Sequence, residues 1–185
     1  EATKTVPWLM EAEKTYLFTI KWGVSTDTQD REGRSIAESD VRPSAEAIRA
    51  ALPAFIGEIE QVPPQFSAVK VDGERAYDIA RAGEAVELEP RQVVVYEAEL
   101  AGTEAPDLAH FRVRSGKGFY IRALVRDLAA KLGAEGHVWR LRRTAVGPFS
   151  ESQSVTLDDL KLLGQKGAAS ERLNPVETAL ADIPA

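Results

Sequence analysis

The chain has 185 residues, a mass of 20.2 kDa and a net charge of −6, with 44% hydrophobic and 28% charged residues. These values are typical of one soluble globular domain, and no apolar run approaches the roughly 20 residues that a membrane-spanning helix needs. The chain has no cysteine and only two histidines, which excludes disulfides and disfavours a structural zinc site, so we expect a cytoplasmic protein without a metal.

Short strands and helices alternate through the first half of the chain. Between Lys14 and Trp22 the aromatic and apolar residues Tyr16, Phe18 and Ile20 stand at every second position, which predicts a strand with one buried face. In the same half we expect a helix capped by Thr5 at Thr5–Met10, a helix capped by Ser44 at Pro43–Ala51, a strand at Phe66–Val71, a turn at Asp72-Gly73 and a helix at Ala76–Ala82.

The second half holds the clearest pattern, an amphipathic helix from Phe119 to Leu132 that ends at Gly133. The other elements expected there are a hairpin of strands at Val93–Leu100 and Phe111–Arg114 joined through Gly102–Leu108, a strand at Val138–Val146, a helix from Thr156 to Leu163 and a short helix from Asn174. This mixed order of strands and helices indicates an α+β fold with a largely antiparallel sheet flanked by helices.

Positive charge is concentrated between Arg112 and Arg143, although the whole chain is acidic. This stretch holds nine basic and two acidic residues, a net charge of +7. Local basic surface decides phosphate binding more than total charge does, so the stretch favours a nucleic-acid ligand. The alternative is a solvated helix face with arginines at strand ends.

Two tyrosines and an arginine are candidates for a site that holds a flat ring and an anion. Tyr16 is either a core residue or a stacking platform for a base that has left its helix. Tyr120 and Arg122 share one face if residues 119–122 are extended, and a guanidinium there can hold a carboxylate or phosphate through two hydrogen bonds.

The stretch around Asp27 and Asp30 resembles the calcium-binding loop of an EF-hand but lacks its pattern of oxygen ligands. Gln29 and Arg31 interrupt the alternating oxygen ligands that such a loop needs. We therefore expect a turn built by the aspartate side chains.

Six motifs in one order give the chain a family resemblance. They are E-A-T-K at 1–4, E-K-T-Y at 13–16, T-D-T-Q-D at 26–30, Q-V-P-P-Q-F-S-A-V-K-V-D-G-E-R-A-Y at 61–77, G-K-G-F-Y-I-R at 116–122 and G-H-V-W-R-L-R-R-T-A-V-G-P-F at 136–149. Together they closely resemble the bacterial tRNA pseudouridine synthases of the TruB family. The resemblance covers about residues 1–150.

The resemblance implies a pseudouridine synthase fold and the isomerisation of a T-loop uridine of tRNA to pseudouridine, without a cofactor. It implies that residues 1–150 are part of the catalytic domain and that residues 61–83 are an RNA-gripping insertion. Residues 151–185 would be a helical segment leading towards a PUA domain that is not in the sequence. The expected partner is the tRNA T arm, bound by a monomer away from any membrane.

The resemblance also implies roles for individual residues. Tyr16 would stack on the target base and is a candidate acceptor of the final proton, and Arg122 would be the partner of the catalytic aspartate. Tyr120 and Leu141 would line the base pocket. The residues expected to face RNA are Lys4, Lys70, Arg75, Arg81, Lys117, Arg142 and Arg143.

The nucleophilic aspartate of the family lies in a G-T-L-D-P-like motif that this sequence does not contain. We therefore expect the chain to be an internal fragment, inactive by itself because electrostatics cannot replace the covalent carboxylate. We also expect Arg122 to lack its carboxylate partner, so that it must meet solvent, another acidic group or a bound anion.

Two other readings of the sequence remain open. One is a non-catalytic RNA-binding or RNA-remodelling module that uses the same basic surface. The other is a structural α+β domain whose basic stretch is incidental. Salt-sensitive RNA binding separates the first from the second.

Overall fold

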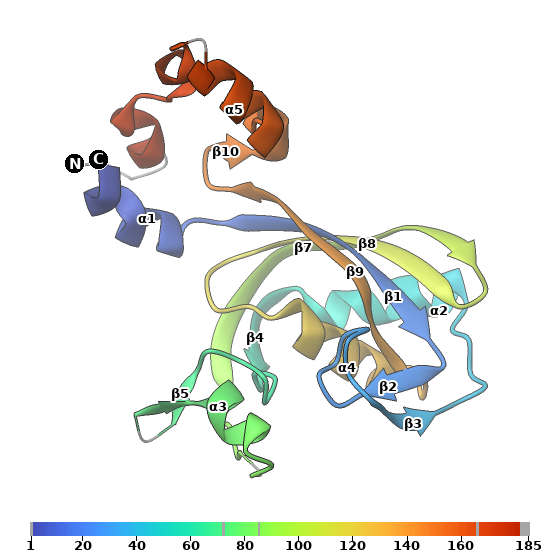
Figure 1. The fold of residues 1–185 in the computed structure, drawn as a ribbon. Coiled ribbons are helices and arrows are strands. Elements are labelled where there is room, and N and C mark those ends of the chain that lie inside the picture. Colours follow the sequence, from blue (N-terminus) through green and yellow to red (C-terminus); the bar gives the residue numbers. More distant parts are fainter. Residues whose placement is uncertain (1, 72, 85, 166, 182–185) are drawn as a thin grey trace.

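The computed structural model describes residues 2–71, 73–84, 86–165 and 167–181. Its centre is a six-stranded sheet with the strand order β10-β9-β1-β8-β7-β4, in which every neighbouring pair is antiparallel (Figure 1). The strands are β1 (Lys14–Trp22), β4 (Gly57–Gln61), β7 (Arg91–Ala105), β8 (Leu108–Ser115), β9 (Gly136–Val146) and β10 (Phe149–Ser150). The expected α+β class with a largely antiparallel sheet is confirmed.

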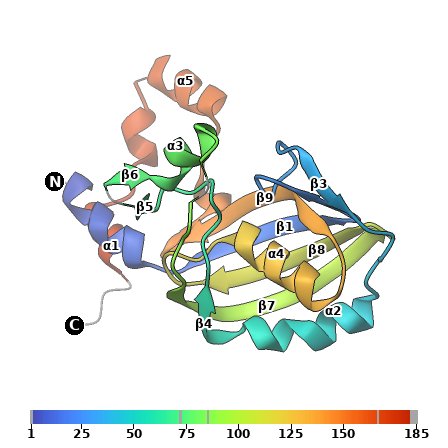
Figure 2. The same ribbon diagram turned by 90° about the horizontal axis from the view of Figure 1, so that it is seen from below.

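The core lies between one face of this sheet and two helices, α2 (Ala45–Ala51) and α4 (Ile121–Lys131), which cover that face in Figures 1 and 2. Alternation along β1 places Phe18, Ile20 and Trp22 on the buried side, as the sequence predicts. Phe18 stacks on Phe111 of β8, with ring centroids 5.1 Å apart. This core fixes the position of α4, and with it the position of Arg122.

Two smaller hairpins extend from the body. β2 (Val24–Thr26) pairs with β3 (Ser35–Glu38), and β5 (Lys70–Val71) pairs with β6 (Glu74–Arg75). The second hairpin continues into α3 (Ala76–Arg81), and these three elements form a projection beyond the edge strand β4 (Figure 1). We call this projection, residues 62–71, 73–84 and 86–90, the insertion; it overlaps most of the stretch 61–83 that the resemblance implies.

The two ends of the described chain lie beside each other (Figure 1). The 3₁₀ helix η1 (Ala2–Thr5) and the helix α1 (Val6–Glu11) both contact the 3₁₀ helix η5 (Val176–Leu180). The other elements near the C-terminal end are η3 (Glu151–Gln153), α5 (Leu157–Gln165) and η4 (Ala169–Arg172). One further 3₁₀ helix, η2 (Leu52–Phe55), directly follows α2. Within the described ranges, no helix is long and apolar enough to cross a membrane.

Several local expectations are confirmed. Ser44 caps α2, since its side chain accepts a hydrogen bond from the Ala47 N–H at 3.2 Å. The Thr156 hydroxyl accepts from the Asp159 N–H at 3.1 Å, as expected at the start of α5. The central strand and the final short helix also form where expected.

Other local expectations are wrong. Thr5 precedes α1 without a side-chain cap, because its hydroxyl donates to the Ala2 carbonyl at 2.7 Å. The strand expected at Phe66–Val71 shortens to β5, and the expected loop at Gly102–Leu108 is mostly strand. Strand β4 was not expected, because its alternation of exposed and half-buried positions includes only one large apolar residue, Ile59. Asp72, half of an expected turn, lies outside the described residues.

Candidate active site and nucleic-acid interface

Arg122 lies in the first turn of α4 and makes three hydrogen bonds to two other segments of the chain. Its Nη1 group donates to the Thr28 carbonyl at 3.0 Å and to Asp30 Oδ2 at 3.4 Å, and its Nη2 group donates to the Phe66 carbonyl at 2.7 Å. The side chains of Arg122 and Asp30 are only 23% and 30% exposed. The guanidinium therefore joins α4, the β2–β3 loop and the base of the insertion.

This geometry corrects the expectation that Arg122 lacks a carboxylate partner. Of solvent, another acidic group and a bound anion, the structure shows another acidic group, Asp30. Three of the five guanidinium N–H groups are used by the acceptors named above. No acceptor among the described residues engages the other two N–H groups, and Arg122 lines the neighbouring cavity.

The hypothesis that Tyr120 and Arg122 share the face of an extended segment is also wrong. Tyr120 is extended, but α4 begins at Ile121, so Arg122 is already helical. The reason is a partner distant in sequence. The Gln61 side chain accepts from the Tyr120 N–H at 2.8 Å and donates to the Tyr120 carbonyl at 3.2 Å, which holds the residue before the helix in place.

The β2–β3 loop holds Asp30 in position. Its Oδ1 atom accepts from the Thr28 hydroxyl at 2.7 Å and from the Glu32 N–H at 3.1 Å, which leaves Oδ2 to face Arg122. Asp27 Oδ1 accepts from the Arg34 N–H at 2.9 Å. The expected turn built by aspartate side chains is therefore confirmed.

The same loop is tied to strand β9. The Val138 N–H donates to the Gln29 carbonyl at 3.1 Å, and the Arg31 N–H donates to the Val138 carbonyl at 3.0 Å. Gln29 has a φ of 63°, in the left-handed region that favours glycine, and it directly precedes Asp30. These backbone bonds offset that strain and hold the aspartate against the arginine.

A cavity of about 550 Å³ lies beside the Arg122–Asp30 pair. Its wall includes the half-buried ring of Trp139 and the side chain of Leu141, which is 50% exposed. Lys21 Nζ lies 4.7 Å from the centroid of the Trp139 ring. A cation, a carboxylate, an aromatic ring and an aliphatic side chain thus line one cavity, a set of groups suited to a flat, polar ring.

Of the four residues predicted for the base pocket and its chemistry, the structure brings two together. Arg122 and Leu141 line the cavity, whereas Tyr16 and Tyr120 do not. Tyr16 is half-buried and packs against the core cluster, opposite Val113 and Arg143 in the sheet. A larger cavity, about 670 Å³, lies between the β2–β3 loop, the insertion and α4 and contains none of the predicted site residues.

The basic stretch is less open to phosphate than its net charge indicates. Besides Arg122, which pairs with Asp30, four of its cations pair with carboxylates from elsewhere in the chain. The pairs are Arg112 with Glu97 and Glu99, Arg114 with Glu13 and Glu97, Lys117 with Glu11, and Arg142 with Glu151. The hydrogen bonds that Arg114 donates to Glu97 and Glu13 raise the pKa of Arg114 further above its usual value.

Other predicted RNA-facing cations are exposed, and no ion pair to a described residue engages them. They are Lys70, Arg75, Arg81 and Arg143. Three of the four belong to the insertion. Lys4 is also exposed, in η1.

Sequence reasoning missed two members of the site. Asp30 was assigned only to a turn, and Trp139 was not singled out. Asp30 lies in the T-D-T-Q-D motif and Trp139 in G-H-V-W-R, so both stood within motifs that carry the resemblance. Among residues 2–71, 73–84, 86–165 and 167–181, no cluster of three or more His, Cys, Asp or Glu could hold a metal.

Comparisons with known proteins agree along the whole chain. The model of the TruB family pseudouridylate synthase N-terminal domain matches residues 1–121, and that of the tRNA pseudouridylate synthase B C-terminal domain matches residues 122–181. The chain is 55% identical over 185 residues to tRNA pseudouridine synthase B of Caulobacter vibrioides and 54% identical over 185 residues to that of Rhodospirillum rubrum. It covers 60% of the length of each of these relatives, and the alignments cover 100% of the chain.

Solved structures show the same fold. A chain from the crystal structure of a Cbf5-Nop10-Gar1 complex superposes with a TM-score of 0.69 at 28% identity, over 96% of this chain and 46% of that one. A chain from an H/ACA RNP bound to a substrate RNA containing 2′-deoxyuridine gives a TM-score of 0.65 at 26% identity, over 96% of this chain and 44% of that one. These likenesses confirm the fold that the motifs imply.

Proposed function

Because the chain belongs to the TruB family of pseudouridylate synthases, we propose that the protein containing these residues isomerises a T-loop uridine of tRNA to pseudouridine. The observation that carries this proposal is the cavity in which Asp30 and Arg122 face Trp139 and Leu141. It occurs in a chain that matches tRNA pseudouridine synthases B from end to end.

The reaction defines what such a cavity must do. The N1–C1′ bond of uridine breaks, the base turns, a C5–C1′ bond forms, and one proton leaves C5 while another is taken up at N1. The product has the same atoms as the substrate, so no oxidant or reductant is consumed. The site must expose the base, orient it and exclude water while the base is detached.

We assign Arg122 to orientation and charge stabilisation at the base or at the attacking carboxylate. Its two available N–H groups can hold an oxygen acceptor in the cavity, while the Thr28, Asp30 and Phe66 acceptors fix the guanidinium plane. Both carboxylate oxygens of Asp30 already accept hydrogen bonds. This favours a positioning role for Asp30 over covalent attack.

The apolar part of the cavity gives the base its walls. Trp139 offers an aromatic face and Leu141 an aliphatic one. Base–aromatic stacking contributes roughly 1–3 kcal/mol for each base. The resemblance implies Tyr16 as the stacking residue and a candidate acceptor of the final proton, and Tyr120 as a pocket residue, although neither lines this cavity in the structure.

For tRNA binding we propose the T arm as the partner and a monomer as the working state, in the cytoplasm. The insertion would contact the RNA backbone through Lys70, Arg75 and Arg81, joined by Arg143 on the sheet and by Lys4 at the N-terminal end. Lys117 and Arg142 can contribute only by exchanging a carboxylate partner for phosphate.

We also propose that the 185-residue polypeptide alone makes no pseudouridine. None of its aspartates lies in a G-T-L-D-P-like motif, and the covalent step needs a nucleophile. Pseudouridine formed by the pure polypeptide would contradict this and would direct attention to Asp30.

The test uses the full-length natural protein and a tRNA transcript tritiated at C5 of uridine. Release of tritium, with pseudouridine found in the digested product, supports the proposal, and a transcript with cytidine at the target position is the matched control. Salt-sensitive binding without turnover would instead support the RNA-binding module, which the exposed cations of the insertion favour as the second candidate.

A further inference from the structure

Tyr77 lies against two arginines of the insertion at once. The Cζ atoms of Arg75 and Arg81 lie 5.8 Å and 5.4 Å from the centroid of its ring. Arg75 Nη1 also donates to the Tyr77 hydroxyl at 3.2 Å. The two arginine–ring distances lie within the range of cation–π attraction.

Local structure explains this grouping. Tyr77 and Arg81 are four residues apart in α3, so their side chains lie on the same face of the helix. Arg75 is the N-cap residue of α3 and also the last residue of β6, where it pairs directly with Lys70 of β5. Directly opposite residues in an antiparallel pair point to the same face, so Lys70 stands on the side of Arg75. We call Arg75, Tyr77 and Arg81 the arginine–tyrosine cluster.

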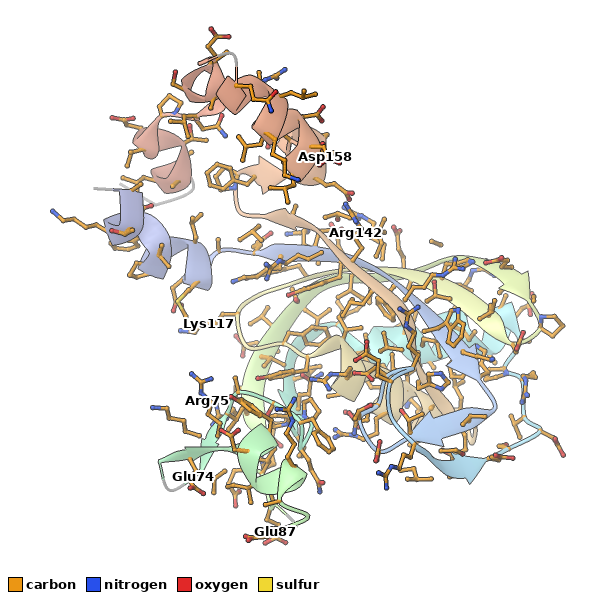
Figure 3. All side chains as sticks on the ribbon, in the orientation of Figure 1. Glu74, Arg75, Glu87, Lys117, Arg142 and Asp158 are labelled. Carbon is orange, nitrogen blue, oxygen red and sulfur yellow. The ribbon has the colours of Figure 1, made fainter. Side chains whose placement is uncertain are left out.

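A second arginine–tyrosine contact, Arg114 on Tyr96, differs from the cluster because its arginine is paired with carboxylates. Arg114 lies 5.0 Å from the ring centroid of Tyr96, but Glu13 and Glu97 neutralise it. In the part of the chain that the structure describes, no carboxylate lies within ion-pair distance of Arg75 or Arg81. In Figure 3, the labelled side chains of Glu74 and Glu87 lie on the opposite side of the insertion from Arg75.

Two guanidinium groups on one ring repel each other, and a shared anion removes that repulsion. Both groups are exposed, and each presents a planar fork of N–H donors that matches phosphate oxygens. The ring limits the rotation of both side chains before any ligand arrives, so less conformational entropy is lost on binding.

We propose that Tyr77 is a positioning residue for tRNA binding, holding Arg75 and Arg81 so that both guanidinium groups meet one phosphate of the RNA backbone. This inference rests on the proposed function, because it takes tRNA as the ligand of the insertion. The predicted RNA-binding residues were all cations. The inference assigns a role in tRNA binding to Tyr77, a neutral residue that makes no phosphate contact itself.

The experiment compares Tyr77→Leu, Tyr77→Phe and Tyr96→Leu in the full-length protein. We expect Tyr77→Leu to weaken tRNA binding about three- to tenfold at 0.15 M salt and to lower the slope of log affinity against log salt by about one. Tyr77→Phe keeps the ring and loses one hydrogen bond, so most of the slope should return. Tyr96→Leu should leave the slope unchanged, because carboxylates already occupy Arg114.

A purely structural role for Tyr77 would not produce this pattern. We expect Tyr77→Leu to raise KM with kcat unchanged, and to have no further effect in an Arg75→Gln/Arg81→Gln background. A Tyr77→Leu protein with the wild-type salt slope, or a Tyr77→Phe protein as weak as Tyr77→Leu, overturns the inference.

The outcome also separates this inference from the proposed function. If the wild-type protein binds and modifies tRNA while Tyr77→Leu keeps its salt slope, the inference alone fails. If the wild-type protein binds tRNA without modifying it and the slope falls in Tyr77→Leu, the inference holds and the proposed isomerase activity fails. A wild-type protein that does not bind tRNA overturns both.

Discussion

Arg122 and the pair Arg75 and Arg81 are held in two different ways. The contrast distinguishes the proposed catalytic site from the proposed tRNA-binding surface. Arg122 is 23% exposed and is fixed by two backbone carbonyls and a carboxylate from two distant segments of the chain. Arg75 and Arg81 are exposed and rest on a tyrosine from their own local segment. The first arrangement needs the whole fold, whereas the second is complete within seven consecutive residues.

This difference teaches where each group can act. A guanidinium locked by tertiary contacts keeps one orientation, which a reaction with a defined geometry requires. Two exposed guanidinium groups that rest on one ring are set to bind a phosphate of the RNA backbone, but they have no contact with the cavity at Arg122. We therefore expect changes at Arg122 to lower turnover and changes in the cluster to lower affinity.

The largest expected effect comes from Arg122→Gln. The change removes the charge and leaves Asp30 without its partner, so single-turnover pseudouridine formation should fall about 10²- to 10³-fold. Filter binding should show tRNA affinity within about threefold of wild type, because the exposed cations remain.

The matched control is Arg126→Gln, one helical turn further along α4. Arg126 donates to the Val62 carbonyl and pairs with Asp127, outside the Arg122 cavity. Equal loss of turnover in both variants would contradict a special role for Arg122. Asp30→Asn should cost less than Arg122→Gln and should have little further effect in the Arg122→Gln background.

The next effect concerns stability and tests whether the body and the insertion unfold separately. Leu128 is completely buried beneath the sheet, so Leu128→Ala should lower the free energy of unfolding by about 2–5 kcal/mol in urea titrations. Val69→Ala, in the smaller core of the insertion, should change this global value by less than half as much, because that region can open locally. Equal losses would show that the two regions unfold as one unit.

A smaller effect is expected from Arg75→Gln/Arg81→Gln, which removes the charges of the cluster. Affinity for tRNA should fall about tenfold at 0.15 M salt, and the slope of log affinity against log salt should fall by about one, because both guanidinium groups meet the same phosphate. Turnover at saturating tRNA should stay at the wild-type value. The matched control is Arg49→Gln on α2, an exposed arginine far from both sites, and an equal change in slope there would argue against a specific phosphate site.

The smallest effect is a pH dependence of stability at Glu97, the carboxylate that pairs with Arg114. Hydrogen bonding and attraction from Arg114 hold the pKa of Glu97 below its ordinary value near 4.5. A carboxyl with a lowered pKa in the folded state adds stability above its ordinary value and loses it as the pH falls through the lowered value.

Urea titrations of wild type and Glu97→Gln should therefore differ slightly at pH 7 and converge in acid, as the pH falls through the lowered pKa of Glu97. A difference that grows in acid would contradict this sign. Glu97→Gln should also remove one of the two carboxylate partners of Arg114, which lies on Tyr96. A slightly steeper slope of log tRNA affinity against log salt would then show that an arginine on a tyrosine attracts phosphate once a carboxylate partner is removed.

Periodicity predicted the elements whose neighbours in sequence decide their structure. Alternation in β1 and the amphipathic pattern of α4 were sufficient, because burial of one face determines both. Ser44 and Thr156 were correctly assigned as caps, because the N–H group each caps lies three residues away. Strand β4 was missed, because it pairs with residues of β7 that are 30 or more positions away.

The site divides in the same way. Arg122 and Leu141 were identified from motifs, and their shared cavity agrees with that identification. The partnership of Arg122 with Asp30 was missed, since 92 residues separate them and no local pattern joins a turn to the start of a helix. The basic stretch was overrated, because Glu11, Glu13, Glu97 and Glu151 approach it only in the folded chain.

The sequence by itself determined the family, the α+β class, the central strand, the main helix and the identity of the cations, because these follow from ordered motifs and short-range periodicity. Only the tertiary structure decided which cations stay available for a ligand, which carboxylate meets Arg122 and which side chains share a cavity. The physical reason is that charge pairing and cavity shape depend on distances between segments far apart in the chain, and sequence order does not set those distances.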